Sequence, residues 1–240
     1  MSRPLALLGS GEFEPWTVEV DAWLLDHADG DGSVLVLPTA SAGEGDAVFD
    51  RWGAKGLAHY EASGVPARVL PLKTRVDAER EELARAIAGA SVVYFSGGNP
   101  WYLAETLRGS ACWDEIVRRH GAGLAYAGCS AGAACLTEVT FDSEADDMRE
   151  VYKPGLGYLR PGVVIGPHWD VLDSWVPGTR EALGSTVPEG GVLVGIDEDT
   201  ALLGDGVTWQ VAGRQGVHVR AGDGWTHAGP GDSLDLRLLP

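Results

Sequence analysis

The stretch LAYAGCSAGAACLTE, residues 124–138, decides the fold of this chain. Its centre, Gly128 to Gly132, satisfies the pattern G-x-S-x-G. The residues before it, Gly123–Ala127, predict a strand, and Ala131–Glu138 predict a helix. A sharp turn from strand to helix holds the central residue in a strained conformation and requires small neighbours on both sides. The sequence therefore predicts a nucleophile elbow with Ser130 at its apex.

Strands and helices alternate on both sides of this elbow. Continuous apolar runs, typical of a parallel sheet covered on both faces, predict strands at Pro4–Leu8, Ser33–Leu37, Ala67–Leu72, Ser91–Phe95, Val163–Ile165 and Val192–Ile196. Amphipathic stretches predict helices at Trp16–Ala28, Asp46–Ser63, Asp77–Ala88, Pro100–Leu107, Cys112–His120 and near Val171–Leu183. From Thr200 on, β-prone segments alternate with Gly and Asp-Gly turns. We expect an α/β fold with a doubly wound, mostly parallel sheet flanked by helices, and antiparallel hairpins near the C-terminus.

Composition narrows the class of protein. The 240 residues, 45% hydrophobic and 22% charged, fit one globular domain over residues 1–240. A net charge of −17 argues against nucleic-acid and anionic-membrane partners, since both bind basic surfaces. The three cysteines form no C-x-x-C pair, and no apolar run has the length of a signal-peptide core or a membrane span. We therefore expect a cytoplasmic protein; a homodimer is compatible with the sequence.

A serine nucleophile needs a base within hydrogen-bond reach, usually an oriented histidine. Of the six histidines, His168 directly follows the expected strand Val163–Ile165, in the segment GPHWD. Active groups of α/β enzymes gather in the loops at the carboxyl ends of parallel strands. We therefore predict that His168 is the base; the alternative is a histidine that only packs in a loop.

Two carboxylates are candidates for orienting His168. Glu198 lies in GIDEDT just after the expected strand Val192–Ile196, at the same sheet edge, and is favoured. Asp147 lies in the polar loop between the elbow helix and the His168 strand. Asp170 is too near His168 in sequence to be the first choice.

The oxyanion of the reaction needs backbone N–H donors. The N–H of Ala131 at the start of the elbow helix is one candidate. The glycines of SGGNP, residues 96–100, can supply a second, although Asn99 there also fits a helix N-cap. Cys129 competes with Ser130 as a nucleophile, but one residue before the apex its side chain should pack inside the sheet.

Four segments, FSGGNPWYLAETL (95–107), YAGCSAGAACL (126–136), GPHWD (166–170) and GIDEDTALL (195–203), resemble peptidase family S51. That family includes dipeptidase E and cyanophycinase, and its members have a class I glutamine amidotransferase-like fold. The similarity runs from about Leu5 to Leu203. Glutamine amidotransferases carry cysteine at the apex, whereas this chain carries serine.

The resemblance implies a serine hydrolase of small peptides with Ser130 as nucleophile and His168 as base. It implies an oxyanion hole formed by the N–H groups of Gly98 and Ala131. Cyanophycinase-like members use a glutamate that matches Glu198, whereas dipeptidase E-like members are assigned an aspartate that Asp147 matches best. The resemblance leaves both acids open.

The substrate is less well defined by the sequence. Asn99, Arg149 and Trp169 are candidate substrate-binding residues, and Arg149 could anchor an acidic residue of a peptide. Dipeptides with N-terminal Asp and isoaspartyl peptides both remain open, and the family favours exopeptidase action. We expect no metal or cofactor, because no His/Cys cluster has ligand spacing and GSGEF lacks the third glycine of a dinucleotide motif.

Three other functions fit the same sequence. The first is a serine esterase or acyl-transfer enzyme on this scaffold. The second is a catalytically silent homologue that acts as a binding module. The third is an interaction protein whose nine tryptophans form a contact surface, although most of them should be in the core.

Overall fold

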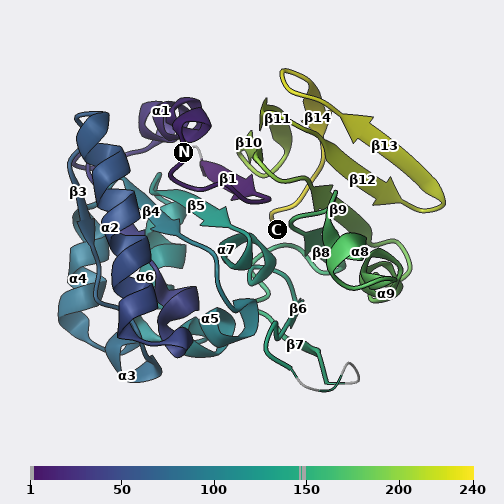
Figure 1. Cartoon of the computed structure of the whole chain (residues 1–240). Coiled ribbons are helices and arrows are strands. Elements are labelled where there is room, and N and C mark those ends of the chain that lie inside the picture. The colour runs from purple at the N-terminus through teal and green to yellow at the C-terminus, as the bar shows by residue number, and fades with distance from the viewer. Residues whose placement is uncertain (1–2, 146, 148–149) are drawn as a thin grey trace.

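The computed structural model, which describes residues 3–145, 147 and 150–240, has an eight-stranded sheet covered by helices (Figure 1). Its order is β14-β11-β10-β1-β5-β4-β2-β3, and the five strands from β1 to β3 in this order are parallel. The other three run antiparallel, so the expected fold class is confirmed. The bounds are β1 Leu5–Leu8, β2 Val34–Leu37, β3 Ala67–Val69, β4 Val92–Phe95, β5 Ala125–Cys129, β10 Thr200–Gly204, β11 Thr208–Gly213 and β14 Ser233–Asp235.

The helices lie on both faces of this sheet. On one face of the sheet, Leu5 and Leu7 of β1 belong to a hydrophobic cluster that includes residues of α4, α5, α6 and α7. On the other face, Ala6 and Leu8 belong to a cluster that includes residues of α1 and α2. The bounds are α1 Val18–His27, α2 Asp46–Ala62, α3 Arg75–Ala78, α4 Glu81–Gly89, α5 Pro100–Leu107, α6 Ala111–His120, α7 Ala131–Ala134, α8 Leu172–Trp175 and α9 Thr179–Ser185, with 3-10 turns at Pro15–Thr17 and Thr39–Glu44. Within the part of the chain that the structure describes, no helix has the length and apolarity needed to cross a membrane.

A second sheet of four strands lies beside the first, in the order β13-β12-β9-β8. Its strands are β8 (Val163–Gly166), β9 (Val192–Ile196), β12 (Val217–Ala221) and β13 (Gly224–Ala228), and a short hairpin joins β6 (Val139–Phe141) to β7 (Tyr152–Pro154). The strands β8 and β9 are parallel, with Gly166 opposite Gly195. The two expected strands that precede His168 and Glu198 are therefore neighbours, in a sheet of their own with β12 and β13.

Three expected helices are shorter than their sequence patterns suggest. Helix 77–88 is two helices, α3 and α4, and helix 171–183 is interrupted at Gly178, whose φ is +85°. The elbow helix is a single turn, Ala131–Ala134. It ends because the carbonyls of residues 135–137 accept hydrogen bonds from the returning segment 156–159 instead of from the next helical turn.

Gly9 allows the end of β1 in the large sheet to approach the turn after β9 in the small sheet. A methyl group on Gly9, just after β1, would lie 2.0 Å from the carbonyl oxygen of Asp197 and 2.6 Å from that of Ile196. Only a residue without Cβ allows this approach. The N–H of Gly9 then donates to Thr200 O at 2.9 Å. The turn after β9, which carries Glu198, is thereby held against the end of β1, the neighbour of β5.

Candidate active site

Ser130 occupies a strained turn between β5 and α7. Its backbone has φ 50° and ψ −104°, which L-residues rarely adopt. A methyl group on Gly128 would lie 2.3 Å from Gly132 O, and one on Gly132 would lie 2.6 Å from Phe95 O. Both flanking glycines are therefore required by space, as the G-x-S-x-G pattern predicts.

His168 lies between the serine and a carboxylate. Its Nε2 is 2.9 Å from Ser130 Oγ, and its Nδ1 is 2.9 Å from Glu198 Oε1. The imidazole and the carboxylate are partly exposed, at 20% and 36% of their side-chain surface. These contacts fit the tautomer in which Nδ1–H donates to Glu198 and Nε2 accepts the hydroxyl proton. Such a serine is poised to lose its proton to the imidazole.

The backbone around His168 fixes the direction of its ring. His168 has a positive φ of 53°, directly after Pro167 at the end of β8. Its carbonyl accepts the N–H groups of Val171 and Leu172 at 3.0 Å each, which closes a tight turn. The exposed indole of Trp175 lies 4.9 Å from the imidazole, between ring centroids. The ring is thus oriented by the turn and by an aromatic neighbour.

Asp170 positions Glu198 and does not touch the imidazole. Its Oδ1 accepts the backbone N–H of Glu198 at 2.8 Å, and its Oδ2 accepts Gln215 Nε2 at 3.2 Å. Gln215 also donates to Glu198 O at 3.1 Å. Asp170, whose closeness to His168 in the sequence disfavours it as the orienting acid, thus has a supporting role that the sequence does not reveal.

Asp147, the alternative acid, lies in the connection between β6 and β7. Its carbonyl accepts the N–H of Glu150 at 2.9 Å. The carboxylate at His168 Nδ1 is that of Glu198, and Nε2 is in contact with Ser130. Both ring nitrogens therefore have their partners without Asp147.

The backbone of the SGGNP loop runs beside the serine. A methyl group on Gly97 would lie 3.6 Å from Ser130 Cβ. Gly98 has φ 142°, and a methyl group there would lie 2.4 Å from the carbonyl carbon of Ala40. Ala131 is the first residue of α7, so its N–H has no acceptor within the helix. Because α7 is one turn long, individual N–H groups, and not a helix macrodipole, provide the positive potential at Ser130.

Glu12, which the sequence analysis did not single out, joins this loop to the elbow strand. Glu12 is 5% exposed; its Oε1 accepts the Gly97 N–H at 2.8 Å, and its Oε2 accepts Cys129 Sγ–H at 3.1 Å. Burial and, second, the Glu12 carboxylate raise the pKa of Cys129 well above its ordinary value. Cys129 is therefore a buried neutral thiol. An acidic residue in the glycine-rich turn GSGEF, which follows an apolar strand, was the available signal.

Comparison with known proteins identifies the family of this chain. A sequence model of peptidase family S51 matches residues 5–211. The chain belongs to peptidase family S51. A solved structure of a peptidase from an acI-B1 Actinobacterium is 30% identical to this S51 chain, covers 98% of each chain and superposes with a TM-score of 0.89. Membership supports peptidase activity.

A second solved structure shares the fold of this S51 protein. It is a putative peptidase E protein from Listeria monocytogenes EGD-e, 16% identical, covering 95% of this chain and 99% of its own, with a TM-score of 0.60. Comparison with curated proteins gave no significant match.

The three candidate substrate-binding residues of this S51 chain lie in different surroundings. Asn99 Oδ1 accepts the N–H groups of Trp101 and Tyr102 at 3.0 and 3.2 Å, so Asn99 is the N-cap of α5, while its Nδ2 donates to Asp142 at 2.6 Å. Trp169 is 4% exposed and lines a pocket with residues of α9, β12 and β13. Arg149 lies outside the described residues.

Proposed function

We propose that this S51 protein is a serine peptidase that hydrolyses short peptides through an acyl-enzyme on Ser130. The observation that carries the proposal is the imidazole of His168, which is 2.9 Å from both Ser130 Oγ and Glu198 Oε1. A nucleophile, a base and an orienting acid in one hydrogen-bonded chain are the requirement for this chemistry.

The reaction begins when Ser130 Oγ attacks the peptide carbonyl and His168 Nε2 takes the hydroxyl proton. Glu198 accepts the Nδ1–H hydrogen bond and stabilises the imidazolium that forms. The imidazolium then protonates the leaving amine, which breaks the C–N bond and leaves the acyl group on Ser130. Water, deprotonated by the same imidazole, releases the acid and restores the serine.

The negative charge on the carbonyl oxygen requires preorganised donors. We assign this role to the N–H groups of Gly98, in the loop after β4, and of Ala131, at the start of α7. The neighbouring Gly97 lies close to the serine, since a methyl group there would be 3.6 Å from Ser130 Cβ. Glu12 supports this arrangement, because it binds the neighbouring Gly97 N–H and fixes the loop relative to β5. Glu12 is a positioning residue in this mechanism.

Short peptides are the proposed substrates because charged groups lie beside the proposed oxyanion loop. Asp142 binds Asn99, the residue after Gly98, and Lys153 Nζ lies 5.1 Å from the ring centroid of Trp101. A carboxylate and an ammonium group near one segment suit the charged ends of a small peptide. N-terminal Asp dipeptides and isoaspartyl dipeptides are the two substrate types to compare.

The test is a dipeptide library with N-terminal Asp, isoAsp and neutral residues, hydrolysed by the wild-type protein and by Ser130→Ala. We expect hydrolysis that falls at least about a thousandfold in the variant. Hydrolysis that survives in Ser130→Ala would overturn the mechanism. Ester turnover without peptide turnover would instead identify an esterase, and no fluorophosphonate labelling of Ser130 would identify a silent homologue.

A matched pair of variants assigns the acid. Glu198→Gln keeps the shape of the side chain but removes its charge, and we expect kcat to fall by about a thousandfold or more. Asp147→Asn makes the same change in the β6–β7 connection and should lower kcat less than about tenfold. The reverse ranking would refute the role of Glu198.

A further inference from the structure

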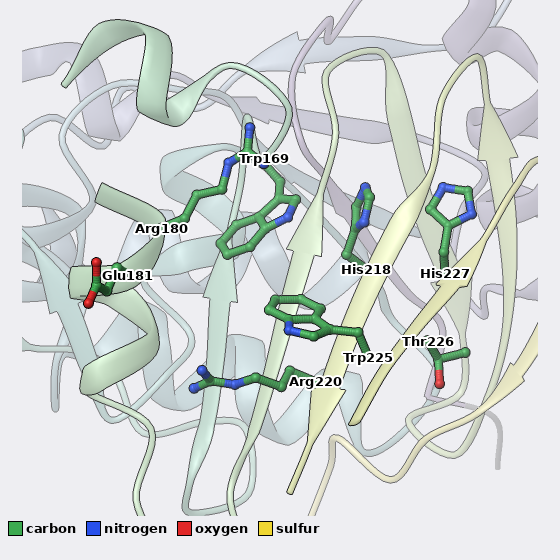
Figure 2. Close-up of a pocket in the computed structure, with 8 residues that line it drawn as sticks. All are labelled: Trp169, Arg180, Glu181, His218, Arg220, Trp225, Thr226 and His227. Atoms are coloured by element: carbon green, nitrogen blue, oxygen red, sulfur yellow. The ribbon is translucent and has the colours of Figure 1, made fainter. Parts of the chain in front are cut away.

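A second group of chemically reactive side chains lies on the outer face of the small sheet. His218 on β12 is directly opposite His227 on β13. On its other side His218 pairs with Gly195 of β9, and Asp197 lies two residues further, which is the spacing of side chains on one face of a strand. Figure 2 shows the imidazoles of His218 and His227 beside each other on adjacent strands. Three neighbouring strands thus bring one carboxylate and two imidazoles together.

The distances within this group suit a shared ligand. His218 Nε2 is 3.1 Å from Asp197 Oδ2, and one donor atom from each of the three residues lies within 4.8 Å of the other two. Gly216 allows the approach, since a methyl group there would lie 2.3 Å from His227 Nε2. The Gly216 N–H also donates to Asp197 Oδ2 at 3.1 Å.

The carboxylate of Asp197 supplies an independent sign of a ligand. Asp197 is 6% exposed, and among the described residues its Oδ1 has no hydrogen-bond partner. A buried carboxylate oxygen without a partner is costly, and such groups in native proteins are normally satisfied by a donor or an ion. A cation held by both carboxylate oxygens of Asp197 would satisfy Oδ1 as well as Oδ2.

We propose that Asp197, His218 and His227 form a site for a divalent zinc ion. Imidazole nitrogen and carboxylate oxygen are ordinary zinc ligands, and three of them leave a position for water or another small ligand. A pocket of about 420 Å³ adjoins the two histidines (Figure 2). Its lining includes both histidines together with Trp169, Arg180 and Trp225. This pocket gives the ion a route to solvent.

The site is separate from the proposed triad, although Asp197 and Glu198 are consecutive. Asp197 is bonded to His218, whereas Glu198 is bonded to His168. An ion on Asp197 would join the end of β9 to β12 and β13. Its expected effect is thermal stabilisation of this sheet, because a ligand that binds only the folded state shifts unfolding to higher temperature.

The experiment measures Zn²⁺ binding to chelator-treated full-length protein by calorimetry, with Co²⁺ as a spectroscopic probe of its ligands. Wild type should bind one Zn²⁺ per chain with a rise in Tm, and His227→Gln should weaken binding at least about tenfold. His227 is exposed, so this variant should fold. The matched control is His27→Gln, which removes another exposed histidine, one distant in sequence from the proposed ligands. It should bind Zn²⁺ as wild type does.

A second control separates this site from the triad, because His168 and Glu198 could also take up zinc. His168→Gln should retain Zn²⁺ binding and the visible Co²⁺ absorption of the wild type. The proposal is overturned if wild type binds no stoichiometric Zn²⁺, if His168→Gln abolishes binding, or if His227→Gln and His218→Gln both bind as wild type does.

Discussion

The buried imidazole of His120 should make the folded state less stable as the pH falls from 7 to 5. His120 ends α6 and is 1% exposed, with Nε2 3.1 Å from Pro4 O and Nδ1 hydrogen-bonded to the Tyr158 hydroxyl. That hydroxyl also accepts a hydrogen bond from Arg3 at 3.0 Å. Burial is the main cause that lowers the pKa of His120 to about 4, and the charge of Arg3 adds to it, against the Pro4 hydrogen bond, which raises it.

The size of the effect follows from the difference between the two states. The unfolded chain takes up the proton near pH 6.5, whereas the folded protein takes it up only near a pKa of about 4. The stabilisation is therefore fully present above pH 6.5 and is lost as the pH falls towards 4. The complete loss is about 3 kcal/mol, of which about 2 kcal/mol should be lost by pH 5.

Urea unfolding followed by tryptophan fluorescence at pH 7 and pH 5 measures this loss. His120→Gln cannot be protonated, so its free energy of unfolding should fall less between the two pH values, by about 2 kcal/mol, than that of wild type. An equal fall in both proteins would refute the reasoning. The result also matters for kinetic experiments. A hydrolysis rate that decreases at low pH can reflect either protonation of the catalytic base or loss of folded protein, and the two must be separated.

Two further predictions concern the elbow. Ser130→Gly should be about 1 kcal/mol more stable than Ser130→Ala in urea unfolding, because a backbone φ of 50° strains any residue with a Cβ. Both variants should be inactive. Equal stabilities of the two variants would refute the strain at this position. The three cysteines are buried, and burial raises the pKa of Cys129 well above its ordinary value. Iodoacetamide at pH 8 should therefore modify the cysteines only in unfolded protein, as measured by mass spectrometry. Alkylation of Cys129 in the native protein would contradict its buried neutral state.

The sequence was sufficient to name the side chains that the structure brings together at the elbow. Ser130, His168 and Glu198 each follow an apolar run that forms a strand, β5 in the large sheet and β8 and β9 in the small one. The turn after β9 lies against the end of β1, the neighbour of β5, which brings the ends of these strands together. The signal is local, because a strand and the residue after it are adjacent in sequence. The pairing of Gly166 with Gly195 then places the last two residues together.

What the sequence did not predict depends on contacts between distant segments. The small sheet forms because β12 pairs with β9, and no local pattern specifies that choice. The role of Glu12 depends on the approach of the turn after β1 to Gly97, and the proposed zinc ligands depend on cross-strand register. The predicted helix lengths were wrong for a similar reason: α7 is short because the distant segment 156–159 donates hydrogen bonds to the carbonyls of residues 135–137, which follow it.

The distribution of backbone strain gives a physical reason for the position of the site. Among the residues that the structure describes, Phe13, Ser130, His168 and Asp199 are the non-glycine residues with positive φ. Two are proposed catalytic residues, and the other two directly follow Glu12 and Glu198. Ser130 directly follows β5 and His168 lies two residues after β8, so these two reversals of the chain occur where strands end at the proposed site. The buried strands on either side hold these reversals in place, so the same rigid sheets that stabilise the fold also maintain the unfavourable turns on which the proposed chemistry depends.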